Sequence, residues 1–171
     1  LILSLSKDEG GSTSMTASVF DLFKLGVGPS SSHTMGPMTA AGLFVGRLRE
    51  AGGLPDVARV ETRLYASLAL TGRGHATDRA VILGLMGFLP AELDPDAGEA
   101  ALLESKATQS LKLGGEVDIV FDEARDIVWA GHERLPQHPN GLTFTAFDAA
   151  GVVRAERTYF SIGGGCVRDE S

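Results

Sequence analysis

The apolar residues of this chain change their spacing more than once along it. Met38, Ala41, Val45 and Leu48 recur at helical spacing, whereas over 57–66 apolar and charged residues alternate as on a half-buried strand. Helical spacing returns before residue 111, and short alternating segments dominate after it. A chain with both periods builds its core between helices and a sheet. The pattern therefore predicts an α+β fold, with helices packed on one face of a small mixed β-sheet.

The bounds of the expected elements follow from these periods and from the positions of glycine and proline. We expect helices over 34–51 or 36–51, 71–88 or 77–88, and 97–111, strands over 57–66, 117–121 and 126–130, and a hairpin of 142–147 with 152–162. We expect a short helix or turn over 19–24, loops over 26–33 and 71–76, and the close of the domain at 163–165. On the second helix, Val81, Leu85 and Leu89 are expected to point inward.

Composition limits the class of protein. A length of 171 residues with 43% hydrophobic residues suits one domain with a buried core. The net charge of −7 disfavours a nucleic-acid partner. No apolar run reaches the roughly 18 residues of a membrane-spanning helix. The single cysteine, Cys166, excludes an internal disulfide and suits the cytoplasm, and it cannot by itself hold an iron–sulfur cluster, which needs about four ligands.

The first fourteen residues differ from the rest. Residues 1–5 are mostly apolar, and 6–14 are polar and rich in glycine and serine, without periodicity or a basic segment. We expect a disordered leader or tag over 1–14, with Met15 as the natural start, and one domain over 15–171.

The first candidate site is the segment GPSSSHT over 28–34, directly before a helix. Hydroxyls and unpaired N–H groups at a helix N-terminus bind anions such as carboxylate or phosphate. A serine beside His33 also suggests a nucleophile, but neighbouring residues point in different directions and adjacency alone does not build a catalytic triad. The alternative is an ordinary serine N-cap with a surface histidine.

The second candidate is the segment GRGHATDR over 72–79, which repeats this arrangement. His75 precedes a helix start that contains Thr77 and Asp78. Imidazole is the side chain best suited to proton transfer near neutral pH. If the two loops meet in space, they form one pocket with two imidazoles and several hydroxyls. The alternative is that Thr77 or Asp78 caps the helix and His75 is exposed.

Two further segments have weaker signals. The segment LPQHPNG over 135–141 predicts a rigid turn, and its His138 and Asn140 are also candidates for binding a substrate carboxylate or amide. His132 is interpreted as a surface residue. The run SIGGGC over 161–166 allows close approach to a ligand or a partner domain, and Cys166 is expected to be a small structural side chain.

Four blocks together carry a resemblance to a known family: SVFDLFKLGVGPSSSHTMGPMTAA, LYASLALTGRGHATDRAVILGL, LPQHPNGLTFTAFD and YFSIGGG. They resemble the β domain, or β subunit, of iron–sulfur-dependent L-serine dehydratase, over about 18–167. One departure is Ala76, where that family usually has glycine. The β fold of the family also resembles the allosteric substrate-binding domain of some phosphoglycerate dehydrogenases.

The resemblance implies a lyase, L-serine ammonia-lyase, that converts L-serine to pyruvate and ammonia in amino-acid degradation and gluconeogenesis. It implies a [4Fe–4S] cluster held by a separate α domain or subunit and not by this chain, which alone is expected to be inactive. A homo-oligomer is also expected. It implies that His75 and His33 act in catalysis. It further implies that eight residues bind substrate: Ser30, Ser31, Ser32, Thr34, Thr77, Asp78, His138 and Asn140.

Several alternatives stay open from the sequence. The domain can instead sense L-serine, or another small ligand, as an allosteric binding module without direct chemistry, or it can be a structural cap over the cluster. A pyridoxal-phosphate route is disfavoured because no lysine lies in a promising loop. The sequence also leaves open whether the α half is fused or separate, and whether serine or threonine is preferred.

Overall fold

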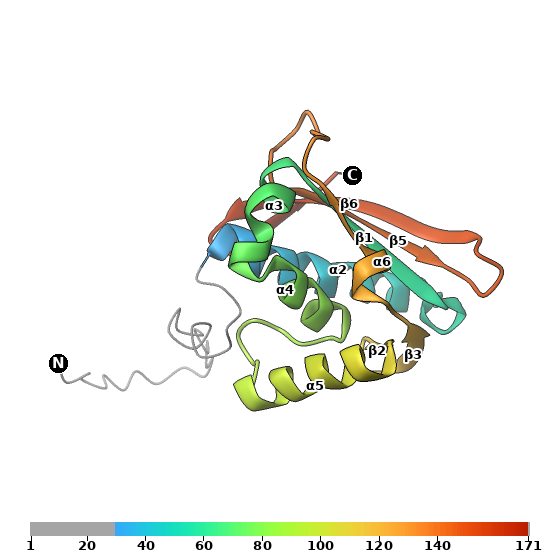
Figure 1. Cartoon of the computed structure of the whole chain (residues 1–171). Coiled ribbons are helices and arrows are strands. Elements are labelled where there is room, and N and C mark those ends of the chain that lie inside the picture. The colour runs from blue at the N-terminus through green and yellow to red at the C-terminus, as the bar shows by residue number, and fades with distance from the viewer. Residues whose placement is uncertain (1–29, 171) are drawn as a thin grey trace, which may run out of the picture.

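The computed structural model describes residues 30–170 and has two layers, a five-stranded sheet and a group of helices that covers one of its faces (Figure 1). The expected α+β class is therefore confirmed. The leader expected over 1–14, the turn expected over 19–24 and the first part of the loop over 26–33 lie outside the described residues.

The sheet joins strands from the first and second halves of the chain. Its order is β4-β1-β5-β6-β7, in which β1 and β4 are parallel and all other neighbours are antiparallel. The strands of this sheet are β1 (Arg59–Tyr65), β4 (Ile127–Ala130), β5 (Gly141–Phe147), β6 (Val153–Gly163) and β7 (Cys166–Asp169). The expected hairpin is β5 with β6. The prediction that the glycines over 163–165 close the domain is wrong, because strand β7 follows them. All three have positive φ, which suits glycine, and they turn the chain into β7.

The core lies between the sheet and α2 (Gly36–Glu50). Val60, Thr62 and Leu64 of β1 are fully buried, and the residues between them are only partly buried, so the expected alternation is confirmed. An aromatic stack links the layers: the rings of Phe44 in α2 and Phe144 in β5 have centroids 5.2 Å apart.

The helices α2 and α4 (Thr77–Leu85) run in the same direction with their N-termini side by side. The beginning of α4 contacts the segment just before α2, and Gly84 near its end packs against Met38 and Ala41. A Cβ at Gly84 would overlap the carbonyl oxygen of Met38, so glycine is what permits this close approach.

The remaining elements connect these two layers. They are η1 (Ser31–Met35), η2 (Leu54–Asp56), α3 (Ala66–Thr71), η3 (Gly72–His75), α5 (Pro95–Thr108), the hairpin of β2 (Ser110–Leu113) and β3 (Val117–Val120), and α6 (Glu123–Asp126). The prediction of a loop over 71–76 is wrong, because α3 is followed directly by η3 in this stretch. The helix expected over 97–111 ends three residues earlier, because Gln109 has a left-handed backbone and β2 follows.

The second helix is also shorter than expected. It ends at Leu85 rather than Phe88, and Gly87 follows with a φ of +92°. The inward position expected for Leu89 is therefore wrong, and this side chain is 47% exposed.

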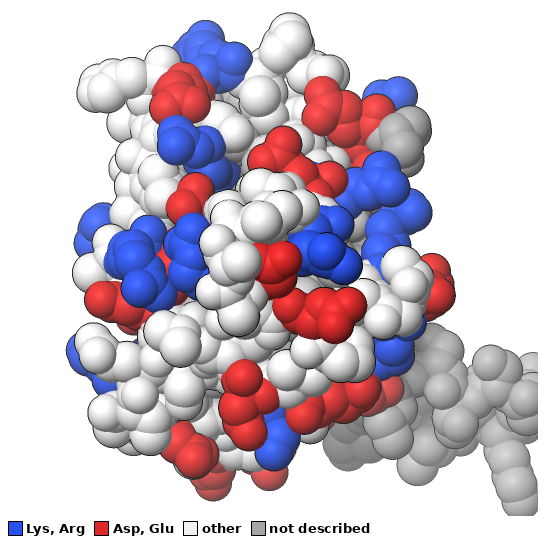
Figure 2. Space-filling view, turned by 90° about the vertical axis from the view of Figure 1, so that its right-hand side faces the viewer, with Lys and Arg blue, Asp and Glu red and all other residues white. Residues whose placement is uncertain are grey.

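The surface carries both signs of charge. On the face seen from the right of Figure 1, acidic and basic side chains are interspersed and do not form a large patch of one sign (Figure 2). Within residues 30–170, no helix combines the length and the apolar character that a membrane crossing requires.

Candidate functional site

Two adjacent helix starts bring the two histidine-bearing segments together. A wide π-type turn, η1, leads directly into α2, and η3 ends at His75 just before α4. The ring centroids of His33 and His75 are 5.0 Å apart, with 38° between the ring planes. The expectation that the two segments meet is confirmed. Because π-type turns occur frequently at functional sites, this junction is a candidate site.

Two reciprocal hydrogen bonds join these segments. The Thr34 hydroxyl donates to the main-chain carbonyl of His75 (3.0 Å), and the Thr77 hydroxyl donates to that of His33 (2.6 Å). Both threonines are completely buried. A buried hydroxyl without a partner costs about 1–3 kcal/mol, so both bonds are strongly favoured. They fix the spacing of the two histidine main chains.

Serine hydroxyls surround the imidazole of His33. Its Nδ1 lies 3.0 Å from Ser32 Oγ and 3.5 Å from Ser30 Oγ, and its Nε2 lies 3.2 Å from Ser67 Oγ. Burial, and secondly the nearby His75, hold the pKa of His33 below its ordinary value of 6.5. His33 is therefore neutral at neutral pH, with one nitrogen that donates and one that accepts.

His75 is half-buried and is oriented by its own segment. Its Nδ1 lies 2.9 Å from the carbonyl oxygen of Thr71. A carbonyl can only accept, so Nδ1 carries the hydrogen and the lone pair of the neutral ring is on Nε2. No other residue in the described part of the chain forms a hydrogen bond with this Nε2. Among the described residues, nothing prevents this nitrogen from interacting with a substrate.

Two alanines at this junction have a left-handed backbone. Ala66 begins α3 with a φ of 39°, and Ala76 follows His75 with a φ of 53°. This conformation costs an L-residue about 1–2 kcal/mol, and such strain is concentrated at functional sites. The φ of Ala76 makes glycine suited to this position.

Ser67 belongs to the site although the sequence analysis did not identify it. Its Oγ contacts Nε2 of His33, and its main-chain N–H donates to the carbonyl of Pro139 (3.2 Å). Ser67 thus connects His33 to the segment that contains His138 and Asn140. The signal in the sequence is a single polar residue in the apolar run LYASLAL, directly after an alternating strand.

The two weaker motifs form the sheet side of this junction. The main-chain N–H of Asn140 donates to Nδ1 of His138 (3.0 Å), and its side-chain amide donates to the carbonyl of Ser161 (3.3 Å). The N–H of Gly164 donates to Ser31 Oγ (3.2 Å). The structure therefore places all four motifs around one junction.

A side chain caps the beginning of η1, whereas none caps the beginning of α4. Ser30 is the N-cap of η1, since its Oγ accepts from the N–H of His33 (3.3 Å). The alternative that Thr77 or Asp78 caps α4 is wrong, because the N-cap is Ala76 and no side chain caps this helix.

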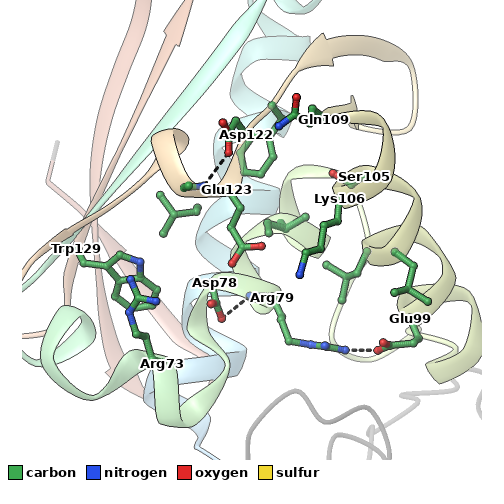
Figure 3. Close-up of a pocket in the computed structure, with 16 residues that line it drawn as sticks. Arg73, Asp78, Arg79, Glu99, Ser105, Lys106, Gln109, Asp122, Glu123 and Trp129 are labelled. Carbon is green, nitrogen blue, oxygen red and sulfur yellow. Dashed lines mark hydrogen bonds and ion pairs between the residues drawn. The ribbon is translucent and has the colours of Figure 1, made fainter.

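Asp78 lies away from the imidazole pair. Its carboxylate accepts from the N–H of Arg79 (2.9 Å) and lines a separate cleft, in which it faces Glu123 (Figure 3). Its predicted role in binding the same substrate has no contact to support it.

The junction is suited to proton transfer and hydrogen bonding. Both ring nitrogens of His33 face hydroxyls, and no carboxylate among the described residues completes a Ser–His–Asp arrangement. Nor does this part of the chain hold a group of three or more His, Cys, Asp or Glu residues that could bind a metal ion. The parallel N-termini of α2 and α4 favour an anionic group between them.

Comparison with known proteins identifies relatives of the chain. The family model described as serine dehydratase beta chain matches residues 18–171. The chain is 46% identical to the L-serine dehydratase of Streptomyces coelicolor over 156 residues, which are 91% of this chain and 34% of that protein. It is 44% identical to L-serine dehydratase 1 of Escherichia coli K12 over 155 residues, 90% of this chain and 34% of that protein. The chain thus spans about a third of the length of the curated relatives it matches.

The backbone of Ala76 gives a first testable prediction. We expect Ala76→Gly to raise the free energy of unfolding by up to about 1 kcal/mol, because glycine removes the left-handed strain but adds entropy to the unfolded chain. The matched control is Ala100→Gly on the exposed side of α5, which should lower it by about 1 kcal/mol. Urea unfolding measures both. If Ala76→Gly lowers the free energy of unfolding as much as the control does, the backbone of Ala76 is not strained.

The lowered pKa of His33 gives a second testable prediction, on the pH dependence of stability. Between its folded-state pKa and 6.5, the unfolded chain binds more protons at this residue than the folded chain does. The contribution of His33 to stability is therefore fully present above pH 6.5 and is lost as the pH falls through this window. An NMR titration of the ring protons, with His132→Ala used to exclude the signals of an exposed histidine, should give a midpoint below 6.5 for His33. A midpoint at or above that value would overturn the assignment.

Proposed function

Because the chain belongs to the serine dehydratase β-chain family, we propose that it forms the β part of an L-serine dehydratase, the lyase that converts L-serine to pyruvate and ammonia. The proposed β part covers residues 15–171. The cluster-bearing α part, whether fused or separate, supplies the rest of the enzyme.

The observation that carries this proposal is the imidazole pair. His33 and His75 lie 5.0 Å apart, and the Thr34 and Thr77 hydrogen bonds hold their main chains together. This arrangement supports a site that moves protons.

The reaction requires removal of the α-proton of serine and loss of its hydroxyl group. A neutral His75 can accept a proton at Nε2, because Nδ1 is bonded to the carbonyl of Thr71. The nearby His75 helps to lower the pKa of His33, so a charge on one ring disfavours a charge on the other. The pair therefore favours one proton at a time, as a proton relay needs.

The serine segment is proposed to hold the substrate. Hydroxyls of Ser30, Ser31 and Ser32 lie at the beginning of η1, which leads directly into α2, and a helix N-terminus favours a carboxylate. The Ser67 hydroxyl keeps the ring of His33 oriented through Nε2. His138 and Asn140 are proposed as the outer part of the same site, where they contact each other.

We place the [4Fe–4S] cluster in the α part. Cys166 is exposed and lies among no group of metal ligands in the described residues, so this chain's donors do not fit a cluster that needs about four ligands. A cluster iron with an open position supplies a Lewis acid for a hydroxyl group. A free, exposed thiol also agrees with the proposed cytoplasmic location.

The test is the turnover of L-serine by the chain combined with its cluster-bearing α part. We expect His75→Ala to lower kcat for pyruvate formation by a factor of about 10²–10⁴, the usual contribution of a positioned acid or base. The matched control is His132→Ala, which removes an exposed imidazole outside the site and should leave kcat unchanged.

Two readouts separate this proposal from its alternatives. Cluster absorbance and co-purification with the α part establish that assembly is intact in each variant. A kcat within about twofold of wild type in intact His75→Ala would leave serine sensing or a structural cap as the function. Calorimetric titration of the chain alone with L-serine then separates these two, since saturable binding supports sensing.

A further inference from the structure

A second polar site lies on the other side of η3 from the imidazole pair. A cleft of about 710 Å³ opens between α4, α5, α6 and β4 (Figure 3). Arg73 in η3 lines this cleft, whereas His75 at the end of the same short helix belongs to the pair. Gly72 packs tightly between Thr77, beside the imidazole pair, and Trp129, in the cleft. A Cβ at Gly72 would lie 2.9 Å from both Thr77 and the Trp129 ring.

Apolar side chains form part of the lining of the cleft, beside its charged and polar groups. They include side chains from four elements or their ends: Ile82, Leu102, Phe121, Ile127 and Trp129. A volume of this size lies in the range of small-molecule sites, which are mainly apolar with a few oriented polar groups.

A pair of carboxyl groups faces into the cleft. Glu123 of α6 points toward Asp78 of α4 (Figure 3). Desolvation, and next the charge of Asp78, hold the pKa of Glu123 above its ordinary value of 4.5, against the opposite influence of Lys106 and Arg73. Two carboxylates that face each other repel, so a cation between them is favoured.

The cations of the cleft differ in what they already bind. Arg79 is ion-paired with Glu99, and the guanidinium of Arg73 stacks on the ring of Trp129 at 4.7 Å. Lys106 has no ion pair with any residue in the described part of the chain. Its ammonium points into the cleft beside Glu123 (Figure 3).

We propose that this cleft binds an α-amino acid with an apolar side chain. Its ammonium group binds between Asp78 and Glu123, its carboxylate pairs with Lys106, and its side chain packs toward Ile127 and Trp129. L-Serine has no apolar side chain to fill these walls, so the cleft is distinct from the proposed serine site.

The test uses calorimetry on the full chain, with four probes that remove one part of the ligand at a time. L-Leucine should saturate with a Kd of about 1 mM or tighter. Isopentylamine lacks the carboxylate, 4-methylpentanoate lacks the ammonium group, and L-serine lacks the apolar side chain. Each should bind about tenfold more weakly or not at all, since a hydrogen bond to a charged group is worth about that factor, and burial of a leucine side chain is worth at least as much.

Variants locate the binding. Glu123→Gln keeps the shape of a largely exposed side chain and should weaken L-leucine binding about tenfold. Glu104→Gln is the matched control, an exposed residue of α5 outside the cleft, and should bind as wild type. His75→Ala should also bind as wild type, so this proposal can fail or succeed independently of the proposed function.

Protonation provides a further check. The charged groups that face Glu123 are Asp78, Lys106 and Arg73. Binding of L-leucine should strengthen as the pH rises from 4.5 through the raised pKa of Glu123, because the ammonium group of the ligand and a proton compete for the Glu123 carboxylate. No saturation by L-leucine, equal affinity for L-serine, or wild-type affinity in Glu123→Gln would each overturn the proposal.

Discussion

The reciprocal hydrogen bonds of Thr34 and Thr77 are the interaction on which the candidate site depends. Each buried hydroxyl donates to the main chain of the other segment's histidine. The bonds hold because α2 and α4 run in the same direction and approach closely at Gly84. The spacing of the two imidazoles is thus set by core packing between helices. The segments over 30–34 and 72–79 therefore hold their histidines in place without a bound substrate.

Much of this arrangement could be predicted from the sequence because its cause is local. The alternation in β1 and the helical spacing in α2 reflect a single buried face each. The meeting of His33 and His75 was predicted from two similar segments that each precede a helix. The chemical roles of these residues stay a prediction, which only activity measurements test.

Other features depend on contacts that no local pattern contains. The contact of Ser67 with His33 requires the left-handed turn at Ala66, and the sequence around it indicates only an apolar run. The strand β7 exists because β6 offers it a free edge after the glycine turn. In the sequence, Asp78 looks like an ordinary carboxylate in the first turn of a helix. Only the packing of α6 against β1 and β4 brings Glu123 close to it.

The short helix η3 divides the two polar regions of the molecule. On one side it carries His75, whose ring lies 5.0 Å from that of His33 between centroids, and on the other it carries Arg73 over Trp129. The two glycines of η3 and the strained residue Ala76 lie in this short segment between the two regions.

The central claim is that the two imidazoles form one site in solution. The most direct measurement is an NOE spectrum of the full chain with labelled histidine, assigned by single substitution of each histidine in turn. Centroids 5.0 Å apart place ring protons within NOE range, so we expect a cross-peak between His33 and His75. If this cross-peak is absent while the cross-peaks within each ring and to neighbouring serines are present, the two histidines do not form one site.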